Sequence, residues 1–441
     1  MNYPEIPSTG HRFLTTWRFM KDPFLCYRNW KQKYGNTFLV NALNGDVVAT
    51  CDPENIRRTF AASFADVSPF AVDTVRPLVG ENSVFLVQGE RHRRERSILS
   101  PPFHGAAMRS QAERIQQVAL EVADGWQTGT TIRVMDPALE LSLEVIIRIV
   151  FGIESKEQTE HFKTKIKEFV SSFHPMLAFT RIFQRPMFGL SPWNRFVAAR
   201  NAFSKLLMEQ ILESRGSGCP EGTVLNHLIK ATYEDGKRAT DESIRDQLVS
   251  MLLAGHETTQ IAIAWAMSWI HRTPDVEAEL RASLNQNDSL LAIIKSELLD
   301  GICNESLRLN AILPDTARTL RVPLEWNELT LQPGTNVALS ICQVHENPEI
   351  YPDPFQFKPQ RWSERSFKPH EFLPFGGGVR RCIGAPLALL EMKIVIGTWL
   401  KRFRFRLPED APDTEPIHRR NITMAPKTGI PLVIVEKICS T

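Results

Sequence analysis

The sequence predicts a mainly α-helical protein with a small β-rich lobe. Helical patterns run with few interruptions from about Ala106 to His271, whereas strand patterns occur only in short pieces near the N-terminus and after Val322. Nine of the 29 prolines lie between Pro314 and Pro374. Because proline interrupts both helices and sheet ladders, we expect a rigid meander of short strands and turns in that stretch.

The composition excludes several classes of protein. The chain has 441 residues, 43% of them hydrophobic, and 52 Lys and Arg balance 50 Asp and Glu. This balance argues against disorder and against a nucleic-acid partner. No N-terminal run approaches the roughly 20 apolar residues of a membrane span, so we expect no membrane anchor. The seven cysteines are scattered and show no CxxC spacing, which is typical of a reducing compartment. We therefore expect a cytoplasmic monomer.

The first elements follow from local signals. An amphipathic helix is expected over Asp22–Tyr34 and is ended by Gly35. Two short strands, Thr37–Ala42 and Val47–Cys51, should then form a hairpin, because the Asn44-Gly45 dipeptide between them favours a tight turn.

A long helix is expected from about Asp241 to His271, with Thr240 as its N-cap. Roughly 30 residues at 1.5 Å per residue would span about 45 Å. Its middle reads Ala254-Gly-His-Glu-Thr-Thr259, which places an acid beside a hydroxyl in an otherwise apolar helix. Burying such groups is unfavourable unless they are paired or needed. They are therefore either a satisfied core pair or a functional pair.

The most informative segment is Phe375-Gly-Gly-Gly-Val-Arg-Arg-Cys-Ile-Gly384, which precedes a helical run, Ala385 to Arg402. A cysteine among glycines just before a helix has its thiolate favoured by the helix N-terminus and by free backbone N–H groups, so it could bind a metal. A lone buried cysteine is the alternative. A phosphate cradle is disfavoured because the GxxxxGK[ST] pattern is missing.

This segment resembles the haem-binding signature of the cytochrome P450 family, F-x-x-G-x-R-x-C-x-G. It matches at Phe375, Gly378, Arg380, Cys382 and Gly384. The resemblance implies that Cys382 is the thiolate ligand of the iron of haem b, that Arg380 pairs with a haem propionate and that Phe375 belongs to the loop under the ring. It also implies a P450 fold with haem between the long helix and the cysteine loop.

The implied fold is a single domain over residues 1–441. Its β-rich lobe would be formed by about 36–52 and 320–345 with the C-terminal strands, and its helical lobe by the rest. The segments Gly80-Glu-Asn-Ser83, Pro101-Pro-Phe-His-Gly105 and Phe375 to Leu390 resemble a bacterial subgroup best known from cyanobacteria. Its members are associated with the oxidation of fatty acids, alkanes or terpenoids.

A second family motif is the pair Glu305-x-x-Arg308, whose i,i+3 spacing puts both side chains on one helical face. Alone, such a pair is usually a solvated surface pair. Here the segment Phe357-Lys-Pro-Gln-Arg-Trp362 follows, and it resembles the family segment whose arginine completes a Glu-Arg-Arg triad. Arg361 fits that role, although Gln360 stands where many members have glutamate. The triad is expected to hold the cysteine loop in place.

The resemblance assigns further roles in the chemistry and in holding the haem. Thr258 would hydrogen-bond the oxygen during its activation, and Glu257 would help to pass in protons through water. In the basic segment Gly89-Glu-Arg-His-Arg-Arg-Glu-Arg96, His92 and Arg96 would contact the propionates. Arg318 would bind a propionate as well.

The substrate pocket carried over by position is mostly apolar. Its expected residues are Phe70, Phe85, Met176, Phe179, Leu253, Ala254, Leu313, Thr316 and Ile422. Met176 and Phe179 lie in the phenylalanine-rich stretch Phe162 to Phe203, which is either core packing or a mobile apolar lid. The apolar character of these residues predicts a hydrophobic substrate. Asp315, which lies beside them in the sequence, is hypothesised to orient a hydroxyl group of the substrate.

The implied activity is a haem-thiolate monooxygenase that inserts one atom of O₂ into a C–H bond or an alkene of a hydrophobic small molecule. No length remains for a flavin or nicotinamide domain, so electrons would come from a ferredoxin or flavodoxin with its reductase. A basic docking face is expected from Arg91, Arg93, Arg94, Arg381 and Lys393, unless these are ordinary solvated charges. The rival functions are a haem-thiolate isomerase or dehydratase and a non-enzymatic haem sensor.

Overall fold

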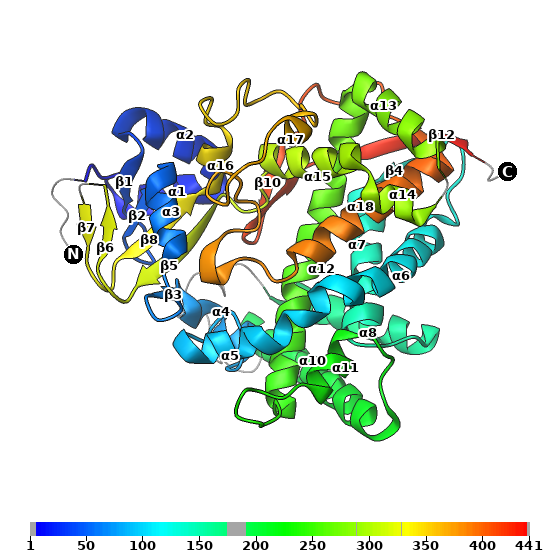
Figure 1. Ribbon diagram of the computed structural model, residues 1–441, viewed down its shortest axis with the longest axis horizontal. Helices are drawn as coiled ribbons and strands as arrows, with labels where there is room; N and C mark the ends of the chain where they lie inside the picture. Colours follow the sequence, from blue (N-terminus) through cyan, green and yellow to red (C-terminus); the bar gives the residue numbers. More distant parts are fainter. Residues whose placement is uncertain (1–5, 174–190, 288, 328, 439–441) are drawn as a thin grey trace. The chain divides into compact units, whose positions relative to one another are not determined.

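A five-stranded sheet forms the main β-structure of the chain. Its spatial order is β1 (Thr37–Val40), β2 (Val47–Thr50), β8 (Asn336–Ser340), β5 (Asp315–Leu320) and β3 (Val67–Pro69). Strands β2 and β8 run parallel, and the other neighbours are antiparallel. The helices α2 (Pro23–Tyr34), α3 (Pro53–Ala61) and α16 (Ile341–His345) are its neighbours (Figure 1). The apolar core at this sheet includes Trp326, whose indole N–H donates to the Thr59 hydroxyl at 2.9 Å.

The computed structural model describes residues 6–173, 191–287, 289–327 and 329–438. The chain divides into two units. The first comprises Met1–Phe70, Ala112–Leu141 and Glu257–Thr441, and the second comprises Ala71–Gln111 and Ser142–His256. Three helices belong partly to each unit, namely α6 (Gly105–Ala123), α7 (Met135–Val145) and the long α12 (Asp241–Arg272).

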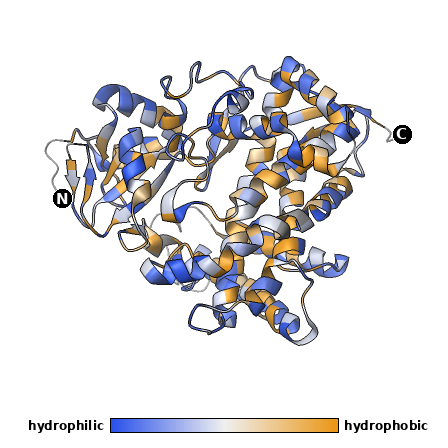
Figure 2. Cartoon of the chain, viewed as in Figure 1, coloured by the Kyte–Doolittle hydropathy of each residue, from blue (hydrophilic) through white to orange (hydrophobic). Residues whose placement is uncertain are grey.

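The first unit also contains the segment that carries the cysteine, together with further helices and smaller sheets. Its other helices are α1 (Arg12–Lys21), α13 (Pro274–Asn285), α14 (Leu290–Lys295), α15 (Glu297–Leu309), α17 (Arg361–Glu364), the 3₁₀ turn η4 (Gly378–Arg380) and α18 (Ala385–Arg402). Its smaller sheets are the hairpins β6 (Leu324–Trp326) with β7 (Leu329–Leu331) and β10 (Ile417–Arg420) with β11 (Thr423–Pro426), and the sheet of β4 (Thr131–Arg133), β12 (Pro431–Lys437) and β9 (Phe403–Arg406). Hydrophobic residues dominate α18, which is buried along most of its length (Figure 2).

The second unit is helical. It contains α4 (Val72–Val79), α5 (Gly89–Leu99), the 3₁₀ turn η1 (Pro101–Phe103), the π-helical turn η2 (Ile146–Val150), α8 (Lys156–Ser172), α10 (Pro192–Ser217) and α11 (Val224–Lys230). Aromatic rings join α8 to α10, since Phe169 stacks on Phe203 and Phe196 with centroids 5.3 and 6.2 Å apart. Within the described part of the phenylalanine-rich stretch, Phe162, Phe169, Phe196 and Phe203 are buried. These side chains therefore belong to the core, which is the first of the two alternatives given above for this stretch. Met176 and Phe179 lie outside the described residues.

The structure confirms the predicted class, mainly α with a small β-rich lobe. The expected first helix is α2, which Asp22 caps by accepting from the Leu25 N–H, and Gly35 ends it with φ +83°. The hairpin of β1 and β2 forms where the Asn44-Gly45 signal predicts it. The long helix begins at Asp241, and the Thr240 hydroxyl accepts from the Ser243 N–H at 3.2 Å, as expected of an N-cap.

The expectation that strands return only after Val322 is wrong. Strand β5 (Asp315–Leu320) precedes it, and α16 (Ile341–His345) occupies the end of the stretch expected to be β-rich. The sequence of β5, DTARTL, does not alternate apolar and polar residues, because its first five positions are all half-buried between neighbouring strands. It therefore lacks the period-two signal of an amphipathic strand.

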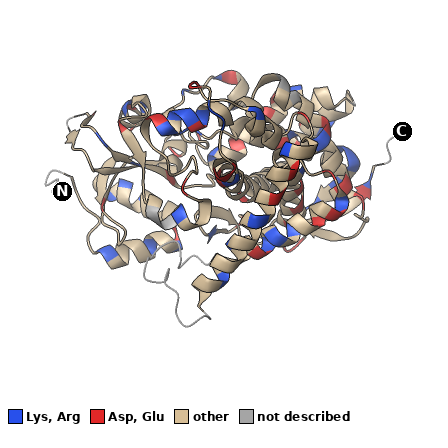
Figure 3. Cartoon of the chain, turned by 90° about the horizontal axis from the view of Figure 1, so that it is seen from below, with Lys and Arg blue, Asp and Glu red and all other residues tan. Residues whose placement is uncertain are grey.

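Basic and acidic residues are interspersed along the helices, in keeping with the balanced charge of the sequence (Figure 3). Among the described residues, no helix combines the length and the apolar composition needed to cross a bilayer.

Candidate active site

The cysteine loop closes on itself just before α18 (Ala385–Arg402). The Cys382 N–H donates to the Phe375 carbonyl at 2.9 Å, and the Arg381 N–H donates to the Gly378 carbonyl at 3.1 Å. The turn η4 (Gly378–Arg380) lies between these bonds, so Cys382 is presented three residues before the first residue of the helix. This is the place where the positive end of a helix dipole stabilises a thiolate.

Glycine is required in this loop for two physical reasons. Gly376 and Gly378 have φ values of +63° and +62°, which side chains rarely adopt. In addition, a Cβ on Gly377 would lie 2.3 Å from the Phe60 ring, and one on Gly378 would lie 2.6 Å from the Phe60 carbonyl. The loop therefore packs its backbone directly against the end of α3 (Pro53–Ala61), which fixes the position of Cys382.

The described cysteines differ sharply in exposure. Of the six, only Cys382 is exposed, whereas Cys219 is half-buried and the other four are buried. Burial raises the pKa of Cys26 and of Cys51 to about 11 and raises the pKa of Cys303 and Cys342 further, which makes those thiols poor ligands. Cys382 is therefore the described thiol best placed to act as a metal ligand.

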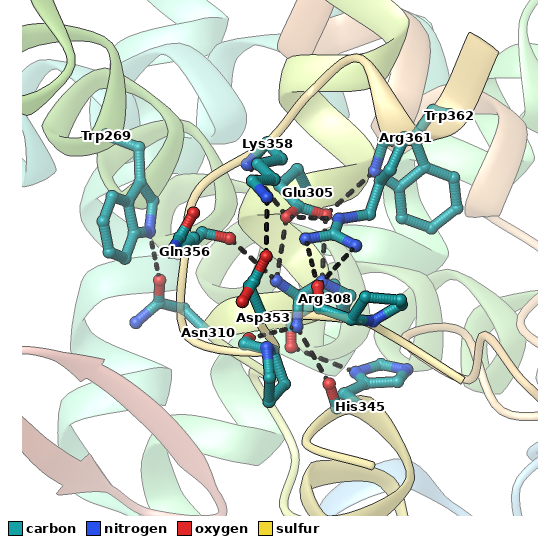
Figure 4. A network of polar contacts seen from close by, with 12 residues as sticks. Trp269, Glu305, Arg308, Asn310, His345, Asp353, Gln356, Lys358, Arg361 and Trp362 are labelled. Carbon is teal, nitrogen blue, oxygen red and sulfur yellow. Dashed lines mark hydrogen bonds and ion pairs between the residues drawn. The ribbon is translucent and has the colours of Figure 1, made fainter. Parts of the chain in front are cut away.

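The predicted triad meets in the structure as a fully buried network (Figure 4). One carboxylate oxygen of Glu305 accepts from Arg308 Nη2 at 2.8 Å, Arg361 Nε at 2.9 Å and the Lys358 N–H at 3.1 Å. The other accepts from Arg308 Nε at 2.9 Å and from Trp362 Nε1 at 3.0 Å. Two guanidinium groups thus surround one carboxylate, which offsets the cost of burying all three charges. Trp362 was not predicted as a member of this network.

His345 connects this network to the cysteine loop. Its Nδ1–H donates to the Arg308 carbonyl at 3.1 Å, and its Nε2 accepts from the Leu373 N–H at 2.9 Å, two residues before Phe375. Arg308 in turn donates to the His345 carbonyl at 2.9 Å. Burial and the charge of Arg308 lower the pKa of His345 to about 3, so the ring is neutral, as both hydrogen bonds require. The network therefore reaches the loop through one imidazole, a link that the sequence did not reveal.

Glu257 and Thr258 lie in the middle of α12 (Asp241–Arg272), where the part of the helix that belongs to the first unit begins. Both are half-buried, whereas the next residues of the helix, from Thr259 to Ser268, are buried. Burial raises the pKa of Glu257, and Arg420 and the Thr423 hydroxyl act in the opposite direction. A half-buried acid with a raised pKa beside a hydroxyl is suited to hold and release a proton.

Arg318 on β5 (Asp315–Leu320) is a desolvated cation. Its Nη1 donates to the Thr316 hydroxyl at 2.9 Å and to the Ala317 carbonyl at 2.7 Å, and burial lowers its pKa to about 10. No carboxylate among the described residues forms an ion pair with it. A half-buried, desolvated guanidinium with neutral acceptors fits an anionic group such as a carboxylate.

The other predicted cofactor contacts lie on elements of both units. Arg380 is half-buried in η4 of the first unit, two residues before Cys382. His92 and Arg96 lie one turn apart on α5 (Gly89–Leu99) of the second unit, and His92 is buried.

The predicted pocket residues are also divided between the units. The first unit contains Phe70 and Leu313, which are half-buried against the core at the sheet, together with Thr316 and Ile422. Ile422 is 59% exposed, in the turn between β10 and β11. The second unit contains Phe85, which is exposed, and Leu253 and Ala254 on α12.

The hypothesis that Asp315 orients a substrate hydroxyl is not supported by the structure. The Tyr27 hydroxyl donates to Asp315 at 2.8 Å within the core of the β-rich part. Because side chains alternate along a strand, Asp315 points to the face opposite to Thr316 and Arg318. Asp315 is thus committed to a packing contact with Tyr27.

The predicted docking face also needs correction. Lys393 is 9% exposed and pairs with Asp300 at 2.7 Å, so it cannot meet a partner protein. Arg93 pairs with Glu234 at 3.0 Å, Arg94 pairs with Asp235 at 3.1 Å, and Arg91 donates to Asn82. Arg381 is exposed.

The donor set points to a prosthetic group rather than to a bare metal ion. Among the described residues, no cluster of three or more His, Cys, Asp or Glu side chains could hold a metal ion. A single exposed thiol therefore suits a metal whose other ligands come from elsewhere, and Arg318 suits carboxylates on the same group. Haem presents an iron atom together with carboxylates, so the first unit has the residues of a haem-thiolate protein.

Comparison with known proteins identifies the family. The cytochrome P450 family model matches residues 4–433. "Putative cytochrome P450 138" of Mycobacterium tuberculosis is 30% identical over 402 residues, covering 90% of this chain and 88% of the relative. "Putative cytochrome P450 135A1" of the same species is 30% identical over 425 residues, covering 94% and 92%. The chain therefore belongs to the cytochrome P450 family.

Solved structures show the same fold. A cyanobacterial CYP120A1 bound to retinoic acid superposes with a TM-score of 0.85 at 21% identity and covers 98% of this chain and 99% of its own. The haem domain of cytochrome P450DA gives a TM-score of 0.84 at 23% identity, covering 97% and 96%. The predicted P450 fold is confirmed, and the chain is a monooxygenase that binds haem through a cysteine thiolate.

Proposed function

We propose that Cys382 is the thiolate ligand of the haem iron, and that Arg318, Arg380, His92 and Arg96 hold the haem propionates. The observation that carries this assignment is the exposure of Cys382 on a loop that admits only glycine beside Phe60. When bound, the haem supplies the oxygen chemistry that transfers one atom of O₂ to an unactivated C–H bond or an alkene.

The proton for this chemistry is proposed to pass through Glu257 and Thr258. The raised pKa of Glu257 allows its carboxyl oxygen to carry a proton closer to neutral pH than an exposed glutamate could. The Thr258 hydroxyl, one residue further along α12, can accept and donate a hydrogen bond at the same time. The pair therefore can relay a proton through water. This capacity favours monooxygenation over the isomerase and haem-sensor alternatives, which need no proton supply.

The substrate is proposed to be a hydrophobic small molecule such as a fatty acid, an alkane or a terpenoid. Apolar side chains supply most of the predicted pocket residues, and Thr316 is the one polar member. The similar fold of CYP120A1, whose structure contains retinoic acid, is compatible with a substrate of this kind. Hydrophobic pockets discriminate weakly between molecules that differ by a methylene, so the pocket supports a class of substrate.

The electron donor is proposed to be a separate acidic ferredoxin or flavodoxin with its reductase. Arg381 and the arginines of α5 (Gly89–Leu99) are the candidates for contact. Because Arg93 and Arg94 already pair with Glu234 and Asp235, a partner would have to compete with these acids. Reduction by the partner should slow as salt rises, and a rate independent of salt would contradict the proposed docking.

The ligand assignment is tested by the spectrum of the reduced protein with carbon monoxide. We expect a strongly red-shifted, thiolate-type Soret band that is lost in Cys382→Ala and kept in Cys219→Ala, a matched change at a half-buried thiol. A band that survives in Cys382→Ala, or that is absent from folded wild type, would overturn the assignment.

The activity is tested by adding a reductase and ferredoxin and measuring NADPH oxidation with dodecanoic acid and with a terpene alcohol. Oxygenated product coupled to NADPH oxidation supports the proposal. Rearranged product without NADPH oxidation would favour the isomerase function instead.

A further inference from the structure

The hairpin of β10 (Ile417–Arg420) and β11 (Thr423–Pro426) reaches the acid on α12. Arg420 Nε lies 3.4 Å from a carboxylate oxygen of Glu257, within ion-pair distance. The Thr423 hydroxyl is close enough to the Glu257 carboxyl to lower its pKa. Arg420 and Thr423 face each other in the register of the hairpin, on either side of a two-residue turn that begins with Asn421 at φ +51°. One tight turn thus brings a cation and a hydroxyl to the same carboxyl group.

The hairpin is anchored independently of Glu257. Arg419 points to the other side of β10 and donates to the carbonyls of Phe19 and Met20, at 3.0 and 3.1 Å, near the end of α1 (Arg12–Lys21). The Met424 N–H donates to the Ile312 carbonyl at 2.8 Å, just after α15 (Glu297–Leu309). Because these contacts fix both strands, the place of Arg420 follows from the fold and does not depend on its own ion pair.

The Thr423 hydroxyl suits both protonation states of its neighbour. It is buried, and in the present arrangement it donates to the Arg420 carbonyl at 2.8 Å. A hydroxyl has one donor and two acceptor positions and can rotate about its bond. It can therefore donate to an ionised Glu257 or, while donating to the Arg420 carbonyl, accept from a protonated Glu257.

We propose that Arg420 and Thr423 are positioning residues that hold the Glu257 carboxyl and set how readily it releases a proton to the reaction. This inference rests on the role proposed above for Glu257.

Opposing physical effects at Glu257 support this role. Burial favours the protonated form of the carboxyl, and the positive charge of Arg420 favours the ionised form. Among the described residues, Arg420 is the one charged side chain that pairs with Glu257. Its own side chain is 39% exposed, so its attraction is weaker than that of a buried guanidinium. The balance keeps the carboxyl able to exchange its proton.

The first measurement does not depend on turnover. The carboxylic-acid C=O band of Glu257 is identified in the infrared spectrum of the haem-loaded protein as the band missing from Glu257→Gln, and it is followed as a function of pH. In Arg420→Gln the band should persist to a pH higher by about one unit, because the opposing charge is gone. Arg420→Lys should largely restore the wild-type titration, and Thr423→Val should shift it in the same direction by less.

Arg404→Gln is the matched control. Arg404 forms an ion pair of similar length, 3.0 Å, with Glu436 on the exposed pairing of β9 (Phe403–Arg406) with β12 (Pro431–Lys437). Its loss should leave the Glu257 titration unchanged. The proposal is overturned if Arg420→Gln titrates as wild type does, or if Arg404→Gln shifts the band as far as Arg420→Gln.

The second measurement separates this inference from the proposed function. NADPH oxidation with reductase, ferredoxin and dodecanoic acid is divided into the part that yields product and the part that yields hydrogen peroxide. Peroxide leakage should rise several-fold in both Glu257→Gln and Arg420→Gln. If Glu257→Gln leaks no more than wild type, the proton role of Glu257 fails. If Glu257→Gln leaks and Arg420→Gln does not, the positioning role alone fails.

Discussion

Two glutamates of the first unit, each paired with arginine, have opposite environments. Glu305 is 0% exposed and accepts hydrogen bonds from Arg308, Arg361, Trp362 and the Lys358 N–H, all within 3.1 Å (Figure 4). Glu257 has a side chain that is 16% exposed and pairs with one arginine at 3.4 Å. The first carboxylate is surrounded by donors, and the second is not.

This difference fits a structural role for Glu305 and the proton-exchanging role proposed for Glu257. Two guanidinium groups and two further N–H donors, the Trp362 indole and the Lys358 backbone, hold the Glu305 carboxylate in place. Glu257 has one partly exposed cation and a hydroxyl that tolerates both forms, and burial raises its pKa. In this chain, therefore, the number and burial of the donors around a carboxyl indicate its role better than the presence of an arginine does.

The largest effect is expected from Glu305→Gln. The change keeps the size of the side chain but leaves the guanidinium groups of Arg308 and Arg361 buried without a counter-charge. Removing one partner of a buried ion pair typically costs about 3–5 kcal/mol. We expect the urea midpoint to fall accordingly and the haem-to-protein ratio after purification to drop, because the network holds the cysteine loop through His345.

Glu54→Gln provides the matched control for this prediction. Glu54 also accepts from two arginines, Arg57 at 2.7 Å and Arg58 at 2.9 Å, but on the exposed surface of α3. We expect no measurable change in the urea midpoint or in haem content. A similar loss in both variants would contradict the view that burial, rather than the number of arginines, determines the effect.

The free energy of unfolding is expected to depend on pH through His345, which contacts Arg308 of the Glu305 network. The pKa of His345 falls from 6.5 to about 3 on folding, so the unfolded chain binds one more proton between these values. Its contribution to the free energy of unfolding is therefore complete above pH 6.5 and is lost as pH falls toward 3, amounting to several kcal/mol. Protonation would also place a second N–H against the Leu373 N–H.

The measurement is the urea midpoint by circular dichroism from neutral to acidic pH, in wild type and in His345→Gln. The variant should start less stable at neutral pH and lose less stability on acidification. Parallel curves for the two proteins would show that another group is responsible for the acid sensitivity.

Sequence patterns predicted some of these features and missed others for identifiable reasons. The glycines and Cys382 form a local motif, and the Glu305 and Arg308 spacing is a local geometric relation, so both are visible in one sequence. Strand β5 (Asp315–Leu320) was missed because its half-buried residues do not alternate. The contact of Arg420 with Glu257 joins residues far apart in the chain, and no local pattern reports it.

A moderate effect is expected from Tyr27→Phe, which tests the corrected position of Asp315. The change removes the hydroxyl that donates to the half-buried Asp315 carboxyl at 2.8 Å. Leaving a buried acceptor without its partner costs about 1–3 kcal/mol, and this should appear as a lower urea midpoint. Product distribution with dodecanoic acid should not change, since Asp315 faces away from Thr316. A change in the site of oxygenation would restore Asp315 to the substrate pocket.

The smallest change in stability is expected from Glu257→Gln, although the substitution is the same as that at Glu305. A carboxyl whose pKa is raised by burial destabilises the folded state once pH exceeds that pKa, because the unfolded chain ionises more readily. Glutamine removes this cost and loses a partly exposed ion pair, so at neutral pH the free energy of unfolding should change by less than about 1 kcal/mol. Haem content should be unchanged, and peroxide leakage should rise. A stability loss as large as that of Glu305→Gln would mean that Glu257 is also a structural acid and would remove the distinction between the two sites.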